Sequence, residues 1–186
     1  MLTAWAGPVL LPSASVDADA LRAVGSGQRF ALLVGPEGFD DPTLAPLRYT
    51  GDDARALRDV LEDPERGHFD KVWTLTGHDA STTPAVRAAM QNLADAVSSP
   101  DDTVFVYFST HGSLHRDARG RLQQFLVLPD THLDALEETG LSHAEVLSWL
   151  DTLPSRRKVL MLATCHSGQG KSRLPETLMR ELSSTK

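Results

Sequence analysis

Short runs of consecutive apolar residues recur along the chain, and each run is bounded by turn-forming or charged residues. Runs of this length, rich in β-branched and aromatic residues, are typical of buried strands. We expect five strands, at residues 29–35, 71–76, 103–110, 122–128 and 158–164. The run from Thr103 to Thr110 is the richest in strand-forming residues, so we expect it to be a central strand covered on both faces.

Between these runs, apolar residues recur at the spacing of amphipathic helices. We expect helices from Asp52 to about Pro64, from Thr83 to before Ser98, and from a capping box of Ser142 and Glu145 to Leu150. Strands that alternate with helices predict a three-layer α/β domain, in which helices flank a mainly parallel central sheet. In such a domain the ligand site lies beyond the carboxyl ends of the strands.

Composition narrows the class of protein. The chain has 186 residues, 41% of them hydrophobic, a formal net charge of −7 and a single cysteine. We expect one folded domain over residues 28–186, preceded by a loose N-terminal arm over residues 1–27. The acidic charge argues against a nucleic-acid partner, and no apolar run reaches the roughly 18 residues of a membrane helix, so we expect no membrane partner either. Because one cysteine forms no internal disulfide, we expect a cytoplasmic protein with a free thiol.

Two residues with catalytic chemistry directly follow predicted strands. His111 comes after the strand that ends at Thr110, and Cys165 comes after the strand that ends at Thr164. Because parallel strands end at the same edge of a sheet, we expect these two residues to lie together. An imidazole can take the proton of a thiol, and the backbone N–H groups of Gly112 and Cys165 are candidate donors to an oxyanion. The pattern predicts nucleophilic catalysis by Cys165 with His111 as general base.

Each of these residues also has an ordinary structural interpretation. A histidine at a strand end can be purely structural, and a lone cysteine is commonly a small buried hydrophobe. His166 is an alternative base, although adjacent side chains on a strand or turn point apart. The remaining histidines are expected to be solvated surface residues: His68, His78, His115, His132 and His143.

The segments YFSTHG and LATCHSG, which contain His111 and Cys165, resemble the His-Gly and Cys-His-Ser-Gly motifs of metacaspases, relatives of the caspases. The segment LRYTGDDARAL, beginning at Leu47, resembles the metacaspase stretch after the first strand. The resemblance extends from about Arg29 to Leu174 and includes the order of the strands. It implies a caspase-like fold and a cysteine endopeptidase that cleaves protein or peptide substrates through a thioester acyl-enzyme, with no cofactor.

The resemblance also implies substrate-binding residues. Metacaspases hold a basic substrate residue with pocket carboxylates, and Asp53 matches one of these. The second carboxylate stands two residues before the cysteine, where this chain has Ala163. Arg48 lies near the position at which caspases carry an arginine for an aspartate substrate. On the basis of Asp53 we expect cleavage after Lys or Arg.

Caspase-like enzymes follow the large catalytic piece with a smaller one, and few residues follow Cys165 in this chain. We therefore expect a small C-terminal subunit as a partner, with Lys186 as a candidate autoprocessing site. Many metacaspases bind calcium through carboxylates in loops near the active site, one of them several residues past the cysteine. This chain has Lys171, Ser172 and Arg173 in that neighbourhood, so we expect no metal. Asp130 and Asp134 are the alternative calcium ligands.

Two other classes of function stay open. The segment CHSGQGKS from Cys165 fits a phosphate-binding loop, except that cysteine replaces the first glycine, so a nucleotide-binding protein is one alternative. A catalytically silent interaction module with the same fold is the other. Nucleotide binding that depends on Lys171 would favour the first, and failure of peptidyl electrophiles to label Cys165 would favour the second.

Overall fold

The computed structural model of the protein describes residues 27–165, so residues 1–26 and 166–186 lie outside the described range. The strands are β1 (Arg29–Gly35), β2 (Lys71–Thr76), β3 (Thr103–Arg116), β4 (Leu122–Val127), β5 (Leu141–Ser142) and β6 (Arg157–Cys165). The helices are α2 (Thr50–Glu62), α3 (Thr83–Ala96), α4 (Leu136–Thr139) and α5 (His143–Thr152), with short 3₁₀ turns η1 (Asp79–Ser81) and η2 (Leu133–Ala135). The predicted bounds of β1 and β2 are confirmed at both ends.

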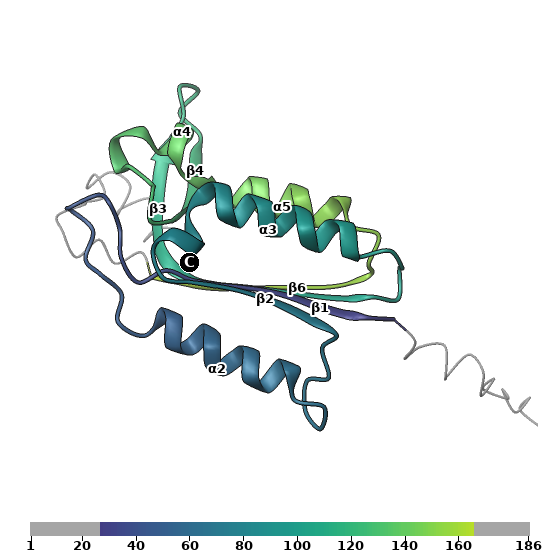
Figure 1. The fold of residues 1–186 in the computed structure, drawn as a ribbon. Helices are drawn as coiled ribbons and strands as arrows, with labels where there is room; N and C mark the ends of the chain where they lie inside the picture. The colour runs from purple at the N-terminus through teal and green to yellow at the C-terminus, as the bar shows by residue number, and fades with distance from the viewer. Residues whose placement is uncertain (1–26, 166–186) are drawn as a thin grey trace, which may run out of the picture.

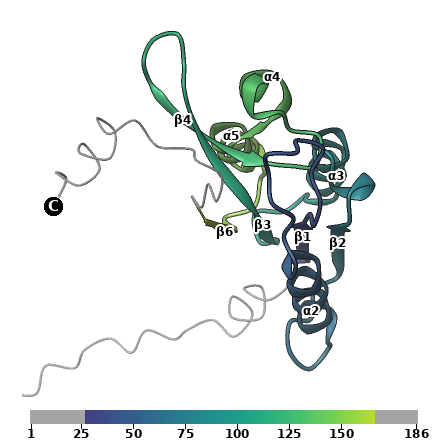
Figure 2. The ribbon, with the colours of Figure 1, turned by 90° about the vertical axis from the view of Figure 1, so that its left-hand side faces the viewer.

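The sheet has a parallel half and an antiparallel half. Strands β2, β1, β3 and β6 lie side by side in that order and run parallel, with β3 between β1 and β6. Strands β4 and β5 continue the sheet from β3 in antiparallel pairing. In the end-on view of Figure 2, the β3–β4 hairpin extends beyond the parallel strands. The predicted α/β fold is confirmed, and the sheet is mixed.

Strand β3 is longer than the sequence analysis predicted. The apolar run stops at Thr110, but the strand continues to Arg116 because the residues from His111 onward pair with β4. A tight turn closes this hairpin, in which the N–H of Asp117 donates to the carbonyl of Arg121 and Gly120 adopts a φ of 77°. His111 therefore lies inside a strand, at the residue where its parallel pairing ends and its antiparallel pairing begins.

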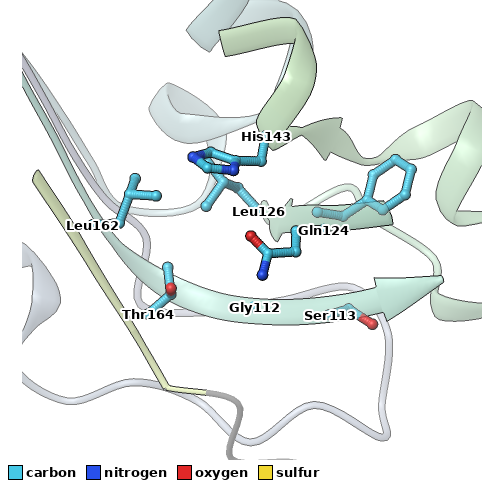
Figure 3. Close-up of a pocket in the computed structure, with 8 residues that line it drawn as sticks. Gly112, Ser113, Gln124, Leu126, His143, Leu162 and Thr164 are labelled. Atoms are coloured by element: carbon cyan, nitrogen blue, oxygen red, sulfur yellow. The ribbon is translucent and has the colours of Figure 1, made fainter. Parts of the chain in front are cut away.

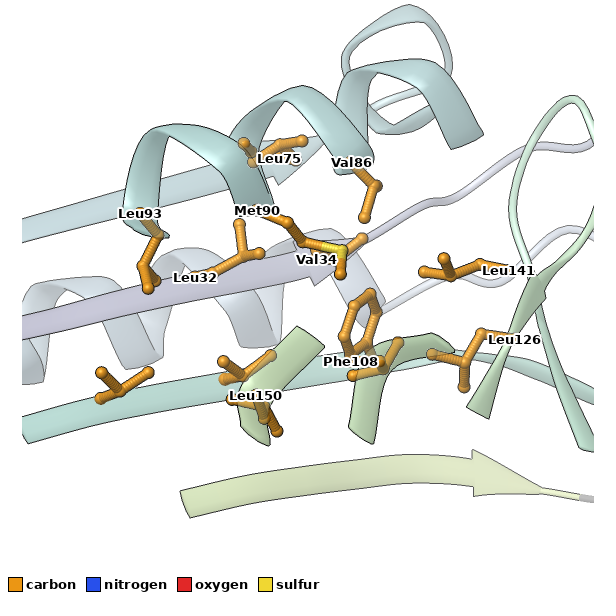
Figure 4. Packing of buried hydrophobic residues seen from close by; sticks show 14 of the residues in the cluster. Leu32, Val34, Leu75, Val86, Met90, Leu93, Phe108, Leu126, Leu141 and Leu150 are labelled. Atoms are coloured by element: carbon orange, nitrogen blue, oxygen red, sulfur yellow. The ribbon is translucent and has the colours of Figure 1, made fainter. Parts of the chain in front are cut away.

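Helices cover both faces of the parallel half (Figure 1). Helices α3 and α5 pack on one face, where the larger core cluster includes Leu32, Phe108 and Met90 (Figure 4). Helix α2 packs on the other face against a smaller cluster that includes Leu33 and Tyr107. Phe108 is fully buried in the middle of β3, which confirms that this strand is central. The core thus fixes β3 directly before it reaches His111.

The start of α5 is capped, although only half of the predicted capping box forms. The Ser142 Oγ accepts the N–H of Glu145 at 3.0 Å, as expected of an N-cap serine. The Glu145 carboxylate does not return to the Ser142 N–H. It accepts two hydrogen bonds from Arg87 of α3, at 2.7 and 2.9 Å, because a guanidinium offers a better-matched partner across the two helices. Within residues 27–165, no helix is long and apolar enough to cross a membrane.

Candidate active site

The ladder between β3 and β6 ends at the pair formed by His111 and Cys165. Nine consecutive residue pairs join these two strands, and this one is the last. Neighbouring strands lie about 4.8 Å apart, so the two backbones are in direct contact at this point. On its other side, His111 pairs with Val127 of β4. The expectation that the two strands bring these residues together is confirmed at the level of the backbone.

The His111 ring is held by the loop between β1 and α2, residues 36–49. Its Nε2 atom lies 2.8 Å from the carbonyl oxygen of Ala45. Because a carbonyl oxygen can only accept, Nε2 carries the proton, and in the neutral ring Nδ1 keeps the free lone pair. The Phe39 ring packs against the imidazole with centroids 5.0 Å apart and an angle of 46° between the planes. The loop therefore sets both the tautomer and the orientation of His111.

Several contacts hold this loop in place. The Asp40 N–H donates to the carbonyl of Pro129 at 2.8 Å, and the Asp41 carboxylate accepts the N–H of Leu133 at 3.1 Å. Hydrogen bonds from Thr43 are the main reason that the pKa of Asp41 lies below its ordinary value. At the start of the loop, Gly35 lies so close to Thr50 that a Cβ would come within 2.2 Å of its carbonyl oxygen. Glycine at this position thus allows β1 and α2 to enclose the loop tightly.

The predicted substrate-binding residues lie on the surface around this site. Arg48 is exposed just before α2 and Asp53 is exposed in its first turn, and neither side chain has a hydrogen-bond or ionic partner within residues 27–165. Asp52, by contrast, bonds Arg55 at 2.8 Å. Ala163 is exposed on β6, two residues before Cys165 and opposite Ser109. The structure brings Ala163 beside the His111 and Cys165 pair and places Arg48 and Asp53 at the far end of the loop that holds His111.

Gly112, a predicted oxyanion donor through its N–H, follows His111 on β3 and lines a small pocket (Figure 3). Because successive residues of a strand face opposite ways, this pocket lies behind His111, on the side of the sheet that α5 covers. Polar groups are common in its lining, which comprises Gly112, Ser113, Gln124, Phe125, Leu126, His143, Leu162 and Thr164.

Other predicted residues do not join this site. Asp130 accepts the N–H and the hydroxyl of Thr83 at 2.7 and 3.0 Å, so it caps the start of α3. Asp134 is exposed on η2, and no cluster of three potential metal ligands occurs in the part of the chain that the structure describes. His166, residues 171–173 and Lys186 lie outside that part, as does nearly all of the phosphate-loop motif.

Sequence reasoning missed the two contacts that orient His111. Phe39 and Ala45 lie in a loop with no regular periodicity, and Ala45 acts through a main-chain oxygen that every residue type possesses. The only sequence signal was the position of the loop, directly after a parallel strand, where functional residues gather in α/β folds.

Comparisons with known proteins relate the chain to one family. The family Peptidase_C14, described as caspase domain, matches residues 28–184. A crystal structure of protein GSU0716 from Geobacter sulfurreducens matches with a TM-score of 0.62 and 22% identity, over 84% of this chain and 55% of that one. The chain thus spans about half the length of that protein, and the likeness concerns the fold. No curated protein matches the chain.

Proposed function

The chain belongs to the caspase-domain family of peptidases, and from this premise we propose that it is a cysteine endopeptidase of the metacaspase type. Cys165 acts as the nucleophile and His111 as the general base. The observation that carries the proposal is the pairing of these two residues at the end of the β3–β6 ladder. This pairing brings the two backbones side by side, and proton transfer requires that donor and acceptor lie close together.

The tautomer of His111 supports this assignment of roles. Since Nε2 donates to Ala45, Nδ1 is free to take the proton from the Cys165 thiol. The thiolate then attacks the scissile carbonyl carbon, and the N–H groups of Gly112 and Cys165 stabilise the oxyanion. The imidazolium returns its proton to the leaving amine as the C–N bond breaks, which leaves a thioester. Water, deprotonated by the same imidazole, hydrolyses the thioester and regenerates the thiol.

Covalent labelling tests the proposed pair of residues. A peptidyl acyloxymethyl ketone with Lys or Arg at the reacting position should modify Cys165, as identified by peptide mass spectrometry. Cys165→Ala should abolish labelling and His111→Ala should slow it about 100-fold or more. His115→Ala is the matched control, because it removes a histidine from the same strand, four residues beyond His111. Equal labelling of wild type and His111→Ala, or no labelling by basic, acidic or apolar probes, would refute the proposal.

We also propose that the substrate residue before the scissile bond is Lys or Arg. Asp53 offers an exposed carboxylate with no partner within the described range, at the start of the helix that follows the His111-binding loop. Arg48 offers the opposite charge nearby and would favour an acidic residue instead. A positional-scanning peptide library decides between the two, since cleavage after Asp or Glu would assign the specificity to Arg48.

The exposed edge of β6 supports a further polypeptide as partner. Within residues 27–165, β6 pairs only with β3. Val159 and Met161 on this strand are each 48% exposed, and their partners on β3, Phe105 and Tyr107, pack toward α2. An apolar, unpaired edge strand favours the addition of another strand. We therefore propose a small C-terminal subunit that pairs with β6, released by autoprocessing after Lys186.

Mass spectrometry of enzyme produced from a longer coding sequence tests autoprocessing. A new C-terminus at Lys186 that forms in wild type and fails to form in Cys165→Ala would support it. Full activity of an uncleaved chain would contradict it. We further propose a cytoplasmic location, since the single cysteine cannot form an internal disulfide.

A further inference from the structure

A second histidine lies close to the loop that holds His111. His78 follows β2, and both nitrogens of its ring contact carboxylates. Its Nε2 lies 2.8 Å from Asp40 of the loop, and its Nδ1 lies 2.9 Å from Asp79 of η1. The His78 side chain is 42% exposed, so it is a surface residue as predicted, but it bridges two segments that are 38 residues apart.

The contact with Asp40 bears on the orientation of His111. Asp40 directly follows Phe39, whose ring packs on the imidazole. Two further contacts of this part of the loop come from segments distant in the sequence, through the carbonyl of Pro129 and the N–H of Leu133. Arg55 provides a separate link near the start of the loop, through Glu37 and Thr76. His78 adds a second link, which ties Asp40, next to Phe39, to the turn that follows β2.

We propose that His78 is a positioning residue for the catalytic histidine. In its charged form it clamps Asp40 to Asp79 and so fixes Phe39 against the His111 ring. This inference rests on the proposed peptidase function. It adds a residue outside the catalytic pair to the parts of the chain that set the reaction rate.

The two hydrogen bonds give the clamp a defined dependence on pH. Carboxylates only accept hydrogen bonds, so both contacts form fully only when both ring nitrogens carry protons. The neutral ring has one N–H and can donate to Asp79 or to Asp40, but not to both. The hydrogen bond to Asp79, followed in size by the hydrogen bond to Asp40, raises the pKa of His78 above 6.5. These two carboxylates are the charged groups that act on the ring. The clamp is therefore complete below about pH 6.5 and is lost as the pH rises through the raised pKa.

The experiment compares His78→Gln and His78→Ala with wild type by two measurements. The first is the rate at which iodoacetamide alkylates Cys165, which needs no substrate pocket, followed between pH 5.5 and 9. Glutamine can donate to one carboxylate at every pH and never carries charge. The second is hydrogen exchange of residues 36–41, which is independent of activity. His68→Asn is the matched control, because His68 is an exposed histidine bonded only locally, and asparagine tolerates its φ of 52°.

We expect wild type to alkylate about threefold to fivefold faster than His78→Gln at pH 6, the range for partly exposed ionic contacts, and at an equal rate at pH 9. The ratio of the two rates cancels the ionisation of the catalytic pair itself. Exchange of residues 36–41 should accelerate at pH 6 in both His78 variants and remain unchanged in His68→Asn. A rate ratio that stays constant with pH, or unchanged exchange of this segment, would overturn the proposal. Alkylation of wild-type Cys165 no faster than that of a free thiol would instead refute the peptidase assignment, and the exchange data would still decide whether His78 holds the loop.

Discussion

The Nε2 atom of His111 lies 2.8 Å from the carbonyl oxygen of Ala45, a residue 66 positions earlier in the chain. The orientation of the histidine is thus set by a loop, and the Phe39 ring completes the contact. We predict that Phe39→Ala lowers kcat about threefold to tenfold with little change in KM, because the imidazole loses its fixed orientation but the substrate contacts remain. Steady-state kinetics on a peptide substrate checks this. Phe39→Tyr, which keeps the ring, should retain wild-type kcat, and equal loss in both variants would contradict the role of the ring.

Asp53 and Asp52 form a matched pair for testing substrate charge. Asp52 already bonds Arg55, whereas Asp53 has no partner within residues 27–165. We predict that Asp53→Asn lowers kcat/KM for peptides with Lys or Arg before the scissile bond about fivefold, the range for an exposed ion pair. Asp52→Asn should leave kcat/KM within twofold of wild type. The assignment of Asp53 fails if the two variants behave alike.

Ala163 offers a gain-of-function test on β6. It is exposed two residues before Cys165, so the part of the chain that the structure describes leaves room for a larger side chain there. We predict that Ala163→Asp raises kcat/KM for basic peptides about threefold to fivefold, because it supplies a second carboxylate beside the catalytic pair. Ala163→Asn, of the same shape without the charge, should show no such gain. A gain in kcat/KM on acidic peptides instead would contradict the proposed preference for basic substrate residues.

The hydrogen bonds of Asp117 should make the stability of the β3–β4 hairpin depend on pH. Its carboxylate accepts hydrogen bonds from Arg121, Gln123 and the N–H of Arg119. The N–H of Arg121 is the main cause that lowers the pKa of Asp117 from 3.8 to about 2. Because the folded pKa is the lower one, its contribution to hairpin stability is present above pH 3.8 and is lost as the pH falls toward 2.

Hydrogen exchange of residues 116–122, corrected for the intrinsic rate at each pH, measures this loss. Protection should decline between pH 4 and pH 2 in wild type. Asp117→Asn should show reduced protection at both values, with no further decline. Asp134→Asn, a change at an exposed aspartate of η2, serves as the control and should follow wild type.

The exposed residues of β6 allow a test of whether a further polypeptide pairs with this strand. Lysine at Val159 places a charge on the edge of β6 that has no strand partner within residues 27–165, and such a charge opposes the addition of another strand. We predict that Val159→Lys abolishes copurification of a separately tagged downstream polypeptide, while Leu147→Lys, a change at an exposed leucine of α5, leaves it intact. Size-exclusion chromatography with light scattering checks both. Retained copurification in Val159→Lys would show that the partner binds another surface.

The parallel half of the fold could be predicted from the sequence because its strands are short apolar runs with clear ends. Gly35 and Pro36 terminate β1, and the strands preceding His111 and Cys165 are nearly continuous in Val, Leu and Phe. Parallel strands that end at one edge make the pairing of His111 with Cys165 a consequence of topology, and that pairing was foreseen. The sequence analysis predicted a charged loop around Asp117, but it did not predict the hairpin that this loop closes.

What the sequence concealed depends on partners that are distant along the chain. The end of β3 carries polar residues such as Ser113 and His115, and only the pairing with β4 makes this segment a strand. His78 carries no local sign of a role, since its partner Asp40 precedes it by 38 residues. Contacts of this kind follow from the assembled sheet and leave no periodic pattern to detect.

Within residues 27–165, the contacts that orient the His111 ring come from residues that precede Cys165 in the chain. Phe39, Ala45 and the β4 partner Val127 are all synthesised before β6, whose last residue is Cys165. Translation therefore supplies the residues that orient His111 before it supplies Cys165, so the contacts of the proposed base do not depend on prior synthesis of the proposed nucleophile.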